Sequence, residues 1–377
     1  MIMNDHLPSG QDRPTQDRGT PLKRGWTTGA CATAATKAAL NALFSGKFPD
    51  PVQISLPGGQ TPFFALAQEK LGGGFAQAGI IKDAGDDPDV THGATIISRV
   101  KKGAPGSGIV FCAGKGVGTV TKPGLSLDVG QPAINPVPRQ MITEIIKNLC
   151  ARNNMAPDIE VEISVPQGEK IAKKTWNPRL GIIGGISILG TSGIVIPYSC
   201  SAWIHSIHSG IDVARALGLG HIVAATGDLS EKAARHFFSL PQEAYIDMGD
   251  FVGGLLKYLR KNPVSHLTIA GGFGKISKLA NAAMDLHSKR SQIDLEFLAG
   301  LLARLGANQE LVTTCRKVNS ANQALELAQK AGFNLAQEVG IEAATKARAI
   351  LKNDNIELDI LVIDRKGTIV GHSGEKI

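Results

Sequence analysis

Hydrophobic and polar positions follow two different patterns along this chain, and the patterns meet near residue 195. In the first part, short apolar or alternating runs end at Gly or Pro and predict strands over 51–59, 61–66, 94–100, 108–114 and 158–166. Two stretches have helical spacing instead, the alanine-rich 27–44, capped by Thr27 or Thr28, and 138–150, which starts with a proline. Strands in hairpins with few helices predict an α+β N-terminal domain.

After residue 195 the pattern becomes strand, Gly turn and helix, and it occurs three times. The apolar runs "GHIVAATGD" (220–228), "AYIDMGD" (244–250) and "SHLTIAGGFGK" (265–275) each end at glycine and lead into a helical segment. This order predicts an α/β domain with a Rossmann-like, largely parallel sheet, followed by helices over 291–353 and a last strand over 358–364. Ligands of such sheets bind at the carboxyl ends of the strands, where these Gly turns lie.

The length of the chain predicts two domains. At 377 residues it exceeds one typical domain of about 150 residues. We therefore expect a two-lobed α/β protein, with domains at 21–195 and 196–377 and a cleft between the lobes. Residues 1–20 are polar and rich in Pro, Gln, Asp and Arg, so they predict a disordered tail. The tail lacks the apolar core of a secretory signal, which predicts a cytoplasmic protein.

Composition and charge narrow the class of partner. The net charge is +7, but basic residues are scattered and only 5% of the chain is aromatic, so we expect no nucleic-acid partner and favour a small polyanionic ligand. Residues 180–204 carry no charge, yet five glycines, Pro197 and several hydroxyls predict buried strands and turns there, with no membrane span. The five cysteines form no C-x-x-C pair, so no protein-bound metal is expected. The sequence does not decide whether the chain forms a homo-oligomer.

Two glycine loops are candidates for anion binding. "GKGVG" (114–118) and "GGFGK" (271–275) each follow an apolar run and offer backbone N–H groups to an anion, or are simply tight turns. Neither is a Walker A loop, because Ile269 and Ile276 stand where that motif needs Gly and a hydroxyl. The dinucleotide fingerprint G-x-G-x-x-G is also absent.

The stretch "DAGDDPDVTHGA" (83–94) places four carboxylates and an imidazole within ten positions. It begins like a calcium loop, but His92 and Ser98 stand where that loop needs Gly and Glu. A rigid acidic turn remains, either a cluster of Asx turns or an acid/base centre. The helix start "RGWTTGACA" (24–32) likewise fits a carboxylate site or a plain helix cap. His205 and His208 are spaced for one helix face but have no third ligand.

Several segments read together resemble one family. "RGWTTGACATAATKAAL", "DAGDDPDVTHGA", "GVGTVTKPGL", "PAINPVPRQMI", "NPRLGIIGGISILGTSGIV" and "GDFVGGLL" occur in the order typical of the cobalt-precorrin-5B C1-methyltransferase family (CbiD). The resemblance runs from about residue 22 to the end and is weakest after 291. The stretch 197–218 lacks the acidic residues that the family pattern leads us to expect there, which leaves the role of 199–208 open.

The resemblance implies an enzyme of cobalamin biosynthesis, a C-methyltransferase of the anaerobic, cobalt-early branch. Its substrate would be a cobalt-containing corrinoid, cobalt-precorrin-5B, methylated at C1 to give cobalt-precorrin-6A, with S-adenosyl-L-methionine as methyl donor. The many carboxylates of such a substrate fit a basic chain. The competing hypotheses are a nucleotide-using small-molecule transferase or kinase, and a non-enzymatic tetrapyrrole carrier with His205 or His208 as axial ligand.

The candidate residues divide into three groups. For the base that makes C1 electron-rich we expect Asp87 or His92. The substrate-binding candidates, from the N-terminal domain, are Arg24, Thr27, Thr28, Gly29, Asp83, Asp86, Lys122, Asn135, Arg139, Ser187 and Thr191. For S-adenosylmethionine we expect the turns of the second domain, with Asp228 or Asp250 accepting from ribose hydroxyls. The full cofactor set is Gly227, Asp228, Gly249, Asp250, Gly271, Gly272 and Gly274.

Overall fold

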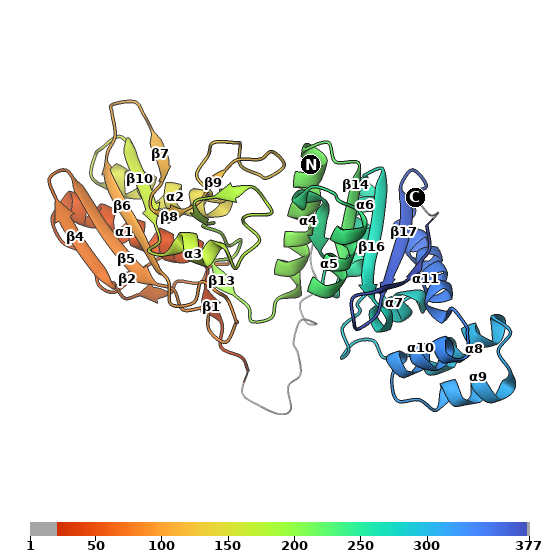
Figure 1. The fold of residues 1–377 in the computed structure, drawn as a ribbon. Coiled ribbons are helices and arrows are strands. Elements are labelled where there is room, and N and C mark those ends of the chain that lie inside the picture. The colour runs from red at the N-terminus through yellow and green to blue at the C-terminus, as the bar shows by residue number, and fades with distance from the viewer. Residues whose placement is uncertain (1–20, 375–377) are drawn as a thin grey trace. The chain divides into compact units, whose positions relative to one another are not determined.

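The computed structural model describes residues 21–374, and the tail predicted for 1–20 lies outside them. Contacts divide the chain into two compact units, Met1–Cys200 and Ser201–Ile377. Both units combine helices with sheets, so the expectation of a mixed α/β protein is confirmed (Figure 1).

The first unit is built on a five-stranded sheet in the order β4-β5-β6-β10-β7. Its neighbours are antiparallel except for β10 and β7, which run parallel. The strands are β4 (Gln68–Gly72), β5 (Phe75–Ile81), β6 (Thr95–Lys102), β7 (Ile109–Ala113) and β10 (Ile159–Ser164). The strands predicted over 94–100, 108–114 and 158–166 are therefore confirmed. The hairpin of β4 and β5 was missed; its edge strand β4 is largely exposed and does not alternate apolar and polar residues.

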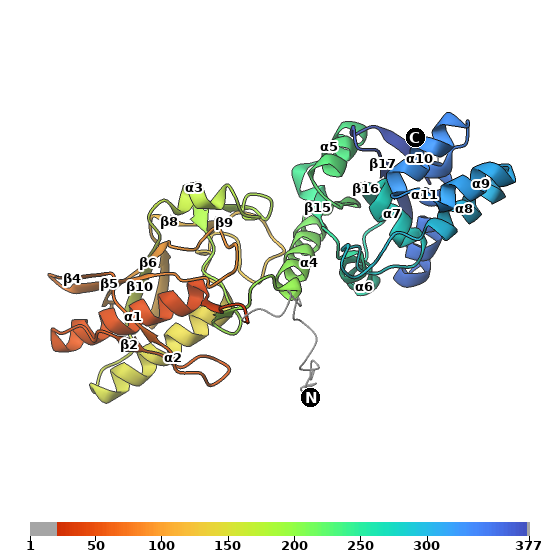
Figure 2. The ribbon, with the colours of Figure 1, turned by 90° about the horizontal axis from the view of Figure 1, so that it is seen from below.

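Two helices pack side by side against this sheet, α1 (Thr28–Ser45) and α2 (Pro136–Arg152) (Figure 2). Seven alanines of α1 are fully buried, and their small side chains let the helix lie close to the strands. Both predicted helices are confirmed, α1 with Thr27 as its N-cap and α2 with a proline in its first turn. The predicted start of α2 at 138 is two residues late.

Short strand pairs organise the loops of the first unit. They are β1 (Gly25–Trp26) with β13 (Ile194–Val195), β2 (Val52–Gln53) with β3 (Phe63–Phe64), β8 (Gly116–Val117) with β12 (Gly185–Ile186), and β9 (Thr119–Val120) with β11 (Ile182–Ile183). One short helix, α3 (Gly168–Ala172), packs near them. The strands predicted over 51–59 and 61–66 shrink to two residues each. The pairing of β1 with β13 brings the start of α1 next to residues 189–195.

The second unit holds a five-stranded sheet in the order β15-β14-β16-β17-β18. The first four strands are parallel and β18 is antiparallel. The strands are β14 (His221–Ala225), β15 (Tyr245–Asp247), β16 (His266–Gly272), β17 (Glu357–Ile363) and β18 (Ile369–His372). The three predicted strand, turn and helix segments and the final strand are all present.

Helix α5 (Asp228–Phe237) packs on one face of this sheet, and the larger apolar core lies on the other face. That core includes α4 (Cys200–Ala216), α6 (Val252–Lys261), α7 (Phe273–Ala280) and α11 (Leu335–Leu351). The predicted helical stretch after 291 is confirmed as α8 (Leu295–Arg304), α9 (Gln309–Arg316), α10 (Ala321–Lys330) and α11, and Figure 1 shows α8 to α10 grouped together beyond α7. Within residues 21–374 no helix is long and apolar enough to cross a membrane.

The strand order creates a switch point between β14 and β16. The chain leaves β14 toward β15 on one side and later returns to β16 on the other side. At such a point the turns after the two strands separate, and a ligand crevice forms at their carboxyl ends.

Candidate functional site

A cavity of about 530 Å³ opens at this switch point. Its volume is in the range of small-molecule sites. The residues around it come from the turns after β14, β16 and β17, from the helices α5 and α7 that follow two of these turns, from the segment before α8 and from the start of α10. They are Thr226, Gly227, Asp228, Leu229, Ser230, Gly272, Phe273, Gly274, Lys275, Lys278, Ile293, Ser320, Ala321, Asn322, Ile363, Asp364 and Arg365.

Four of the seven candidate cofactor residues line this cavity: Gly227, Asp228, Gly272 and Gly274. Gly271 has a packing role instead, because a Cβ there would lie 2.7 Å from Ile276 Cδ1 and 2.9 Å from Thr226 Cγ2. Gly249 and Asp250 belong to the neighbouring turn after β15 and are not among the lining residues. The structure thus brings two of the three predicted turns together around one space.

Two helices that begin at the cavity have no side-chain cap. Helix α5 follows Gly227 and helix α7 follows Gly272, and neither glycine can cap the first N–H groups. By contrast, α10 is capped by Ser320, whose hydroxyl accepts from Gln323 N. Uncapped helix starts carry a partial positive charge and suit the negative end of a ligand.

Charged side chains of both signs face the cavity. The Asp228 carboxylate is exposed and has no partner among residues 21–374, whereas Asp364 Oδ1 is occupied by the N–H groups of Lys366 and Thr368. Lys278 is buried and donates to Leu286 O at 2.8 Å, and burial lowers the pKa of its ammonium group. Asp228 is therefore the more exposed of the two lining carboxylates, and both its oxygens, together with Oδ2 of Asp364, are free to accept from a ligand.

Lys275 links the turns around the cavity. Its ammonium group donates to Thr226 O at 2.8 Å and lies 3.0 Å from Asp250 Oδ1. One side chain of α7 thereby ties the turn after β14 to the turn after β15. Sequence reasoning missed this role, although the "GGFGK" motif contained the lysine. It also missed the contribution of α10, for which the sequence carries no signal.

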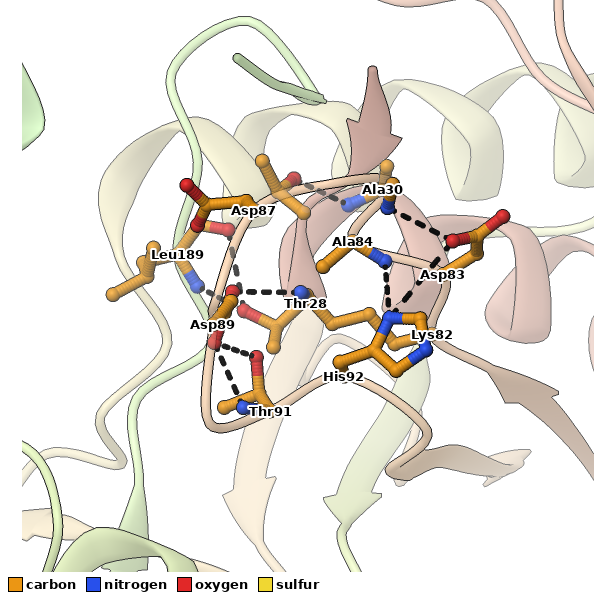
Figure 3. Close-up of polar contacts among 12 residues, drawn as sticks. Thr28, Ala30, Lys82, Asp83, Ala84, Asp87, Asp89, Thr91, His92 and Leu189 are labelled. Carbon is orange, nitrogen blue, oxygen red and sulfur yellow. Dashed lines mark hydrogen bonds and ion pairs between the residues drawn. The ribbon is translucent and has the colours of Figure 1, made fainter. Parts of the chain in front are cut away.

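In the first unit, the acidic stretch 83–94 folds as a loop over a buried lysine (Figure 3). The side chain of Lys82 is 1% exposed, and its Nζ lies 2.7 Å from Asp89 Oδ2. The other carboxylate oxygen of Asp89 accepts from the N–H and hydroxyl of Thr91. Burial opposes ionisation of Asp89, but the Lys82 charge and these hydrogen bonds outweigh it and hold the pKa of Asp89 below its ordinary value.

Other polar groups of this loop are also engaged. Asp83 pairs with Lys23 Nζ at 2.7 Å, and this bond holds the pKa of Asp83 low. Asp86 accepts from the backbone N–H of Lys23 at 2.6 Å. The Ala84 N–H donates to Nδ1 of His92 at 3.1 Å, as Figure 3 shows. The lone pair that His92 would need as a base at Nδ1 is thereby occupied.

Asp87 is the exception in this loop. Its Oδ1 accepts one hydrogen bond, from the backbone N–H of Tyr198 at 2.8 Å, and no side-chain cation pairs with it among residues 21–374. The carboxylate is half-buried. Of the two predicted base candidates, Asp87 therefore keeps a free acceptor oxygen.

The start of α1 uses its own polar groups for packing. Thr27 accepts from Ala30 N, and Gly29 N donates to Leu189 O. The Thr28 hydroxyl accepts from Leu189 N at 2.9 Å. A Cβ on Gly29 would lie 2.6 Å from Pro138 Cγ, so only glycine fits between the two helices. The structure gives Thr27, Thr28 and Gly29 buried, structural roles.

The remaining substrate candidates divide by whether they are engaged. The Arg139 guanidinium holds the chain before α2 through Ile134 O, Pro132 O and Gln131, and burial lowers its pKa. Ser187 is buried and donates to Asn177. Lys122 and Arg179 have partners as well. The side chains of Arg24, Asn135 and Thr191 have no partner within the described part of the chain, and those of Arg24 and Thr191 are exposed.

The loop "GKGVG" is a tight turn. A Cβ on Gly116 would lie 2.0 Å from Val165 O, so close backbone packing accounts for this glycine. His208 stacks on Tyr258 with ring centroids 3.9 Å apart, and burial lowers the pKa of His208. Among residues 21–374 no group of three or more His, Cys, Asp or Glu side chains is arranged to hold a metal ion.

A largely buried polar network at the amino-terminal ends of β14, β16 and β17 was also missed. Asp359 accepts from Thr268 at 2.6 Å and pairs with the rings of His266 at 3.1 Å and His372 at 2.6 Å. His221 stacks on His266 with centroids 3.9 Å apart. Burial, with His266 adding to it, lowers the pKa of His221 to about 4, while the bond to Asp359 raises the pKa of His266. These residues are far apart in sequence, so no local pattern links them.

Comparisons with known proteins match one family along most of the chain. A family model described as CbiD matches residues 15–197, and one described as CbiD, C-terminal domain, matches 285–374. The chain is 60% identical over 350 residues to a cobalt-precorrin-5B C(1)-methyltransferase of Paramagnetospirillum magneticum, covering 93% of this chain and 98% of the relative. It is 59% identical over 358 residues to the protein of the same name from Rhodospirillum rubrum, covering 95% and 99%.

A solved structure is also similar in sequence. It is the crystal structure of the cobalamin biosynthesis protein cbiD from Archaeoglobus fulgidus, at 28% identity. The match covers 83% of this chain and 85% of that chain, with a TM-score of 0.37.

Proposed function

This chain belongs to the CbiD family, and from that premise we propose that it is a cobalt-precorrin-5B C1-methyltransferase of cobalamin biosynthesis. The observation that carries the proposal is the identity of about 60% with relatives of that name over nearly the whole of both chains. The substrate is then a cobalt-precorrin, in which the cobalt arrives inside the small molecule. The product would be cobalt-precorrin-6A, as expected for the cobalt-early branch.

We propose S-adenosylmethionine as the methyl donor and the cavity of the second unit as its site. The donor would supply an electrophilic methyl group on a sulfonium sulfur. The free carboxylate of Asp228 suits ribose hydroxyls, which is the role that acidic residues after such strands have in nucleotide-binding α/β sheets. The uncapped start of α7, with Lys275 and Arg365, suits the carboxylate of the amino-acid part, whereas the first turn of α5 already carries Asp228 and Glu231.

The charges around the cavity also suggest an orientation. A sulfonium is a cation, so it is expected to lie away from Lys275, Lys278 and Arg365. A carboxylate close to the sulfonium would stabilise the ground state and slow the transfer. We therefore place Asp228 at the ribose and not at the sulfur. On this proposal the Rossmann-like character of the second domain is what provides the cofactor site.

We propose the first domain as the corrinoid-binding domain. Arg24 is an exposed cation near the acidic loop, and Asn135 and Thr191 have free polar side chains for the substrate periphery. Holding the ring carbon and the methyl group in line would supply much of the rate enhancement. Asp87 is our candidate for the group that takes up a proton as C1 becomes electron-rich, because its Oδ2 is free while the Nδ1 lone pair of His92 is not.

Calorimetry and a transfer assay test the proposal together. The full-length protein is titrated with S-adenosylmethionine, with ATP and with a cobalt corrinoid, and methyl transfer is followed from a labelled donor. We expect binding of S-adenosylmethionine and transfer to the corrinoid. Binding of ATP without S-adenosylmethionine would favour the nucleotide-using transferase, and binding of the corrinoid without any transfer would favour a carrier.

Two substitutions then separate the proposed roles. Asp228→Asn is expected to weaken binding of S-adenosylmethionine with little change for the corrinoid. Asp87→Asn is expected to lower the transfer rate at saturating substrate by about 10²-fold or more, the usual contribution of a general base. Parent transfer rates in Asp87→Asn would exclude the acid/base role.

A further inference from the structure

Tyr198 has an unusual backbone conformation for a residue with a bulky side chain. Its φ is 57°, in the left-handed region that non-glycine residues rarely adopt. Its side chain is also exposed, with 58% of the residue accessible to solvent. The chain therefore accepts both a strained backbone and a large exposed ring at one position. Strain of this kind is retained where the surrounding structure imposes it, and it clusters at functional sites.

The acidic loop holds the backbone of Tyr198 by a hydrogen bond. The Tyr198 N–H donates to Asp87 Oδ1 at 2.8 Å, across 111 positions of sequence. On the other side, Pro197 is buried and fixes its own φ, which limits how the chain can enter the turn. The backbone of Tyr198 is thus tied to the loop that carries the candidate base.

The chain segments joined to the acidic loop and leading to Tyr198 carry exposed apolar side chains and one cation without a partner among residues 21–374. Ile196 is 45% exposed and directly follows β13, and Leu189, which accepts from Gly29 N at the start of α1, is 48% exposed. The backbone of Arg24 crosses the same loop, since a Cβ on Gly85 would lie 2.7 Å from the Arg24 carbonyl carbon. The Arg24 side chain is exposed and has no partner among residues 21–374.

We propose that Tyr198 is a substrate-positioning residue whose ring lies against the flat face of the corrinoid, while Arg24 binds one of its peripheral carboxylates. This inference rests on the proposed function and names a contact for its substrate. A tetrapyrrole-derived ring offers a broad, largely apolar face edged by carboxylates, which matches exposed apolar side chains next to a free guanidinium. Asp87 then has two tasks, since one oxygen holds the Tyr198 backbone and the other stays free toward the substrate.

The decisive variant is Tyr198→Gly, because glycine adopts a left-handed φ without strain. The variant is expected to be at least as thermally stable as the parent protein. Its Kd for cobyrinic acid, a cobalt corrinoid with free carboxylates, is expected to rise about tenfold or more, whereas its Kd for S-adenosylmethionine stays unchanged. Tyr198→Phe should keep the parent affinity, because the ring face is retained. Phe63→Ala removes an aromatic ring of 63% exposure elsewhere in the same unit and should change neither constant.

Two readouts distinguish the failure of this inference from failure of the proposed function. If Tyr198→Gly binds cobyrinic acid as the parent does, or if the parent does not bind it at all, the positioning role is wrong. If binding depends on Tyr198 but no labelled methyl reaches a corrinoid, the positioning role stands and the methyltransferase proposal fails. Arg24→Gln adds a second check, since it should weaken binding and reduce its dependence on salt concentration.

Discussion

The ion pair between Lys82 and Asp89 offers a quantitative test of how the acidic loop is held. Lys82 is 1% exposed and Asp89 is 25% exposed, and their charged atoms are 2.7 Å apart. The substitution Asp89→Asn keeps the shape of the side chain and an oxygen for Thr91, but it leaves the Lys82 ammonium buried without a counter-ion. The mutation therefore removes charge compensation and little else.

The expected cost follows from the burial of the two groups. Removing one partner of a buried pair costs ~3–5 kcal/mol, and the partial exposure of Asp89 places this pair at or below the lower end, at ~2–3 kcal/mol. For a domain of 150–250 residues each kcal/mol lowers the melting temperature by about 2–4 °C, so we expect a decrease of about 5–10 °C for the first unit. The cost should be local, with faster hydrogen exchange in β5 and β6 and unchanged exchange in the second unit.

The dependence on pH gives an independent check. The pKa of Asp89 is depressed in the folded protein, so its stabilising effect is present above the unfolded pKa of about 3.9 and is lost as pH falls through the lower, folded value. The difference in free energy of unfolding between the parent protein and Asp89→Asn should therefore persist from pH 7 to pH 5 and shrink in stronger acid.

Two further variants serve as controls. Asp86→Asn changes an exposed carboxylate of the same loop and should cost under ~0.5 kcal/mol, as most surface substitutions do. Combining Asp89→Asn with Lys82→Met removes the buried charge and should restore much of the lost stability. A melting temperature of Asp89→Asn within 1–2 °C of the parent, about 0.5 kcal/mol by the same scaling, would refute the reasoning, because the pair would then contribute no more than a surface ion pair.

Three more predictions concern the second unit. Lys275→Met removes the tie between the turns at the cavity and should raise the Kd for S-adenosylmethionine about tenfold, equal to ~1.4 kcal/mol; an unchanged calorimetric Kd would contradict this. Gly271→Ala places a Cβ 2.7 Å from Ile276 and should lower the free energy of unfolding by ~1–3 kcal/mol, measured by thermal unfolding. Gly300→Ala in α8, where a Cβ would meet no heavy atom within 4 Å, should raise it by ~0.5–1 kcal/mol. Equal changes in melting temperature for the two variants would refute the packing argument. The pKa of His221 is lowered to about 4, so between about pH 6.5 and pH 4 the unfolded chain binds a proton that the folded chain does not, and the stability of the folded protein falls as pH drops. His221→Asn should lose less stability than the parent protein over this range. An equal decrease in melting temperature between pH 7 and pH 5 for the variant and the parent would contradict this.

Local patterns in the sequence were sufficient for most helices and for the longer strands. The alanine-rich spacing of 27–44 predicts α1 because side-chain size and capping act within a few residues of each other. Likewise, apolar runs that end at glycine predict β14, β15 and β16, since each run is buried on both faces of a parallel sheet. The edge strand β4 escaped prediction because an exposed edge does not need alternating apolar residues.

The candidate site was only partly predictable. The sequence identifies the glycine turns after β14 and β16, but the strand order decides that these two turns share a cavity and that the turn after β15 only supports it. In the same way, the acidic stretch is visible as a cluster of carboxylates. Which of them are engaged depends on Lys23, Lys82 and Tyr198, and the pairs to Lys23 and Tyr198 span 60 or more positions.

The sequence by itself determined the family, the alternation of elements and the type of chemistry, because these rest on ordered local motifs. Tertiary structure alone decided which polar groups stay free. Asp87 and Asp228 keep an unpaired acceptor while Asp83 and Asp89 do not, and the backbone of Tyr198 is held by a bond to a distant loop. The physical reason is that a hydrogen bond or ion pair depends on proximity in space, and proximity between distant residues is set by how sheets and helices pack.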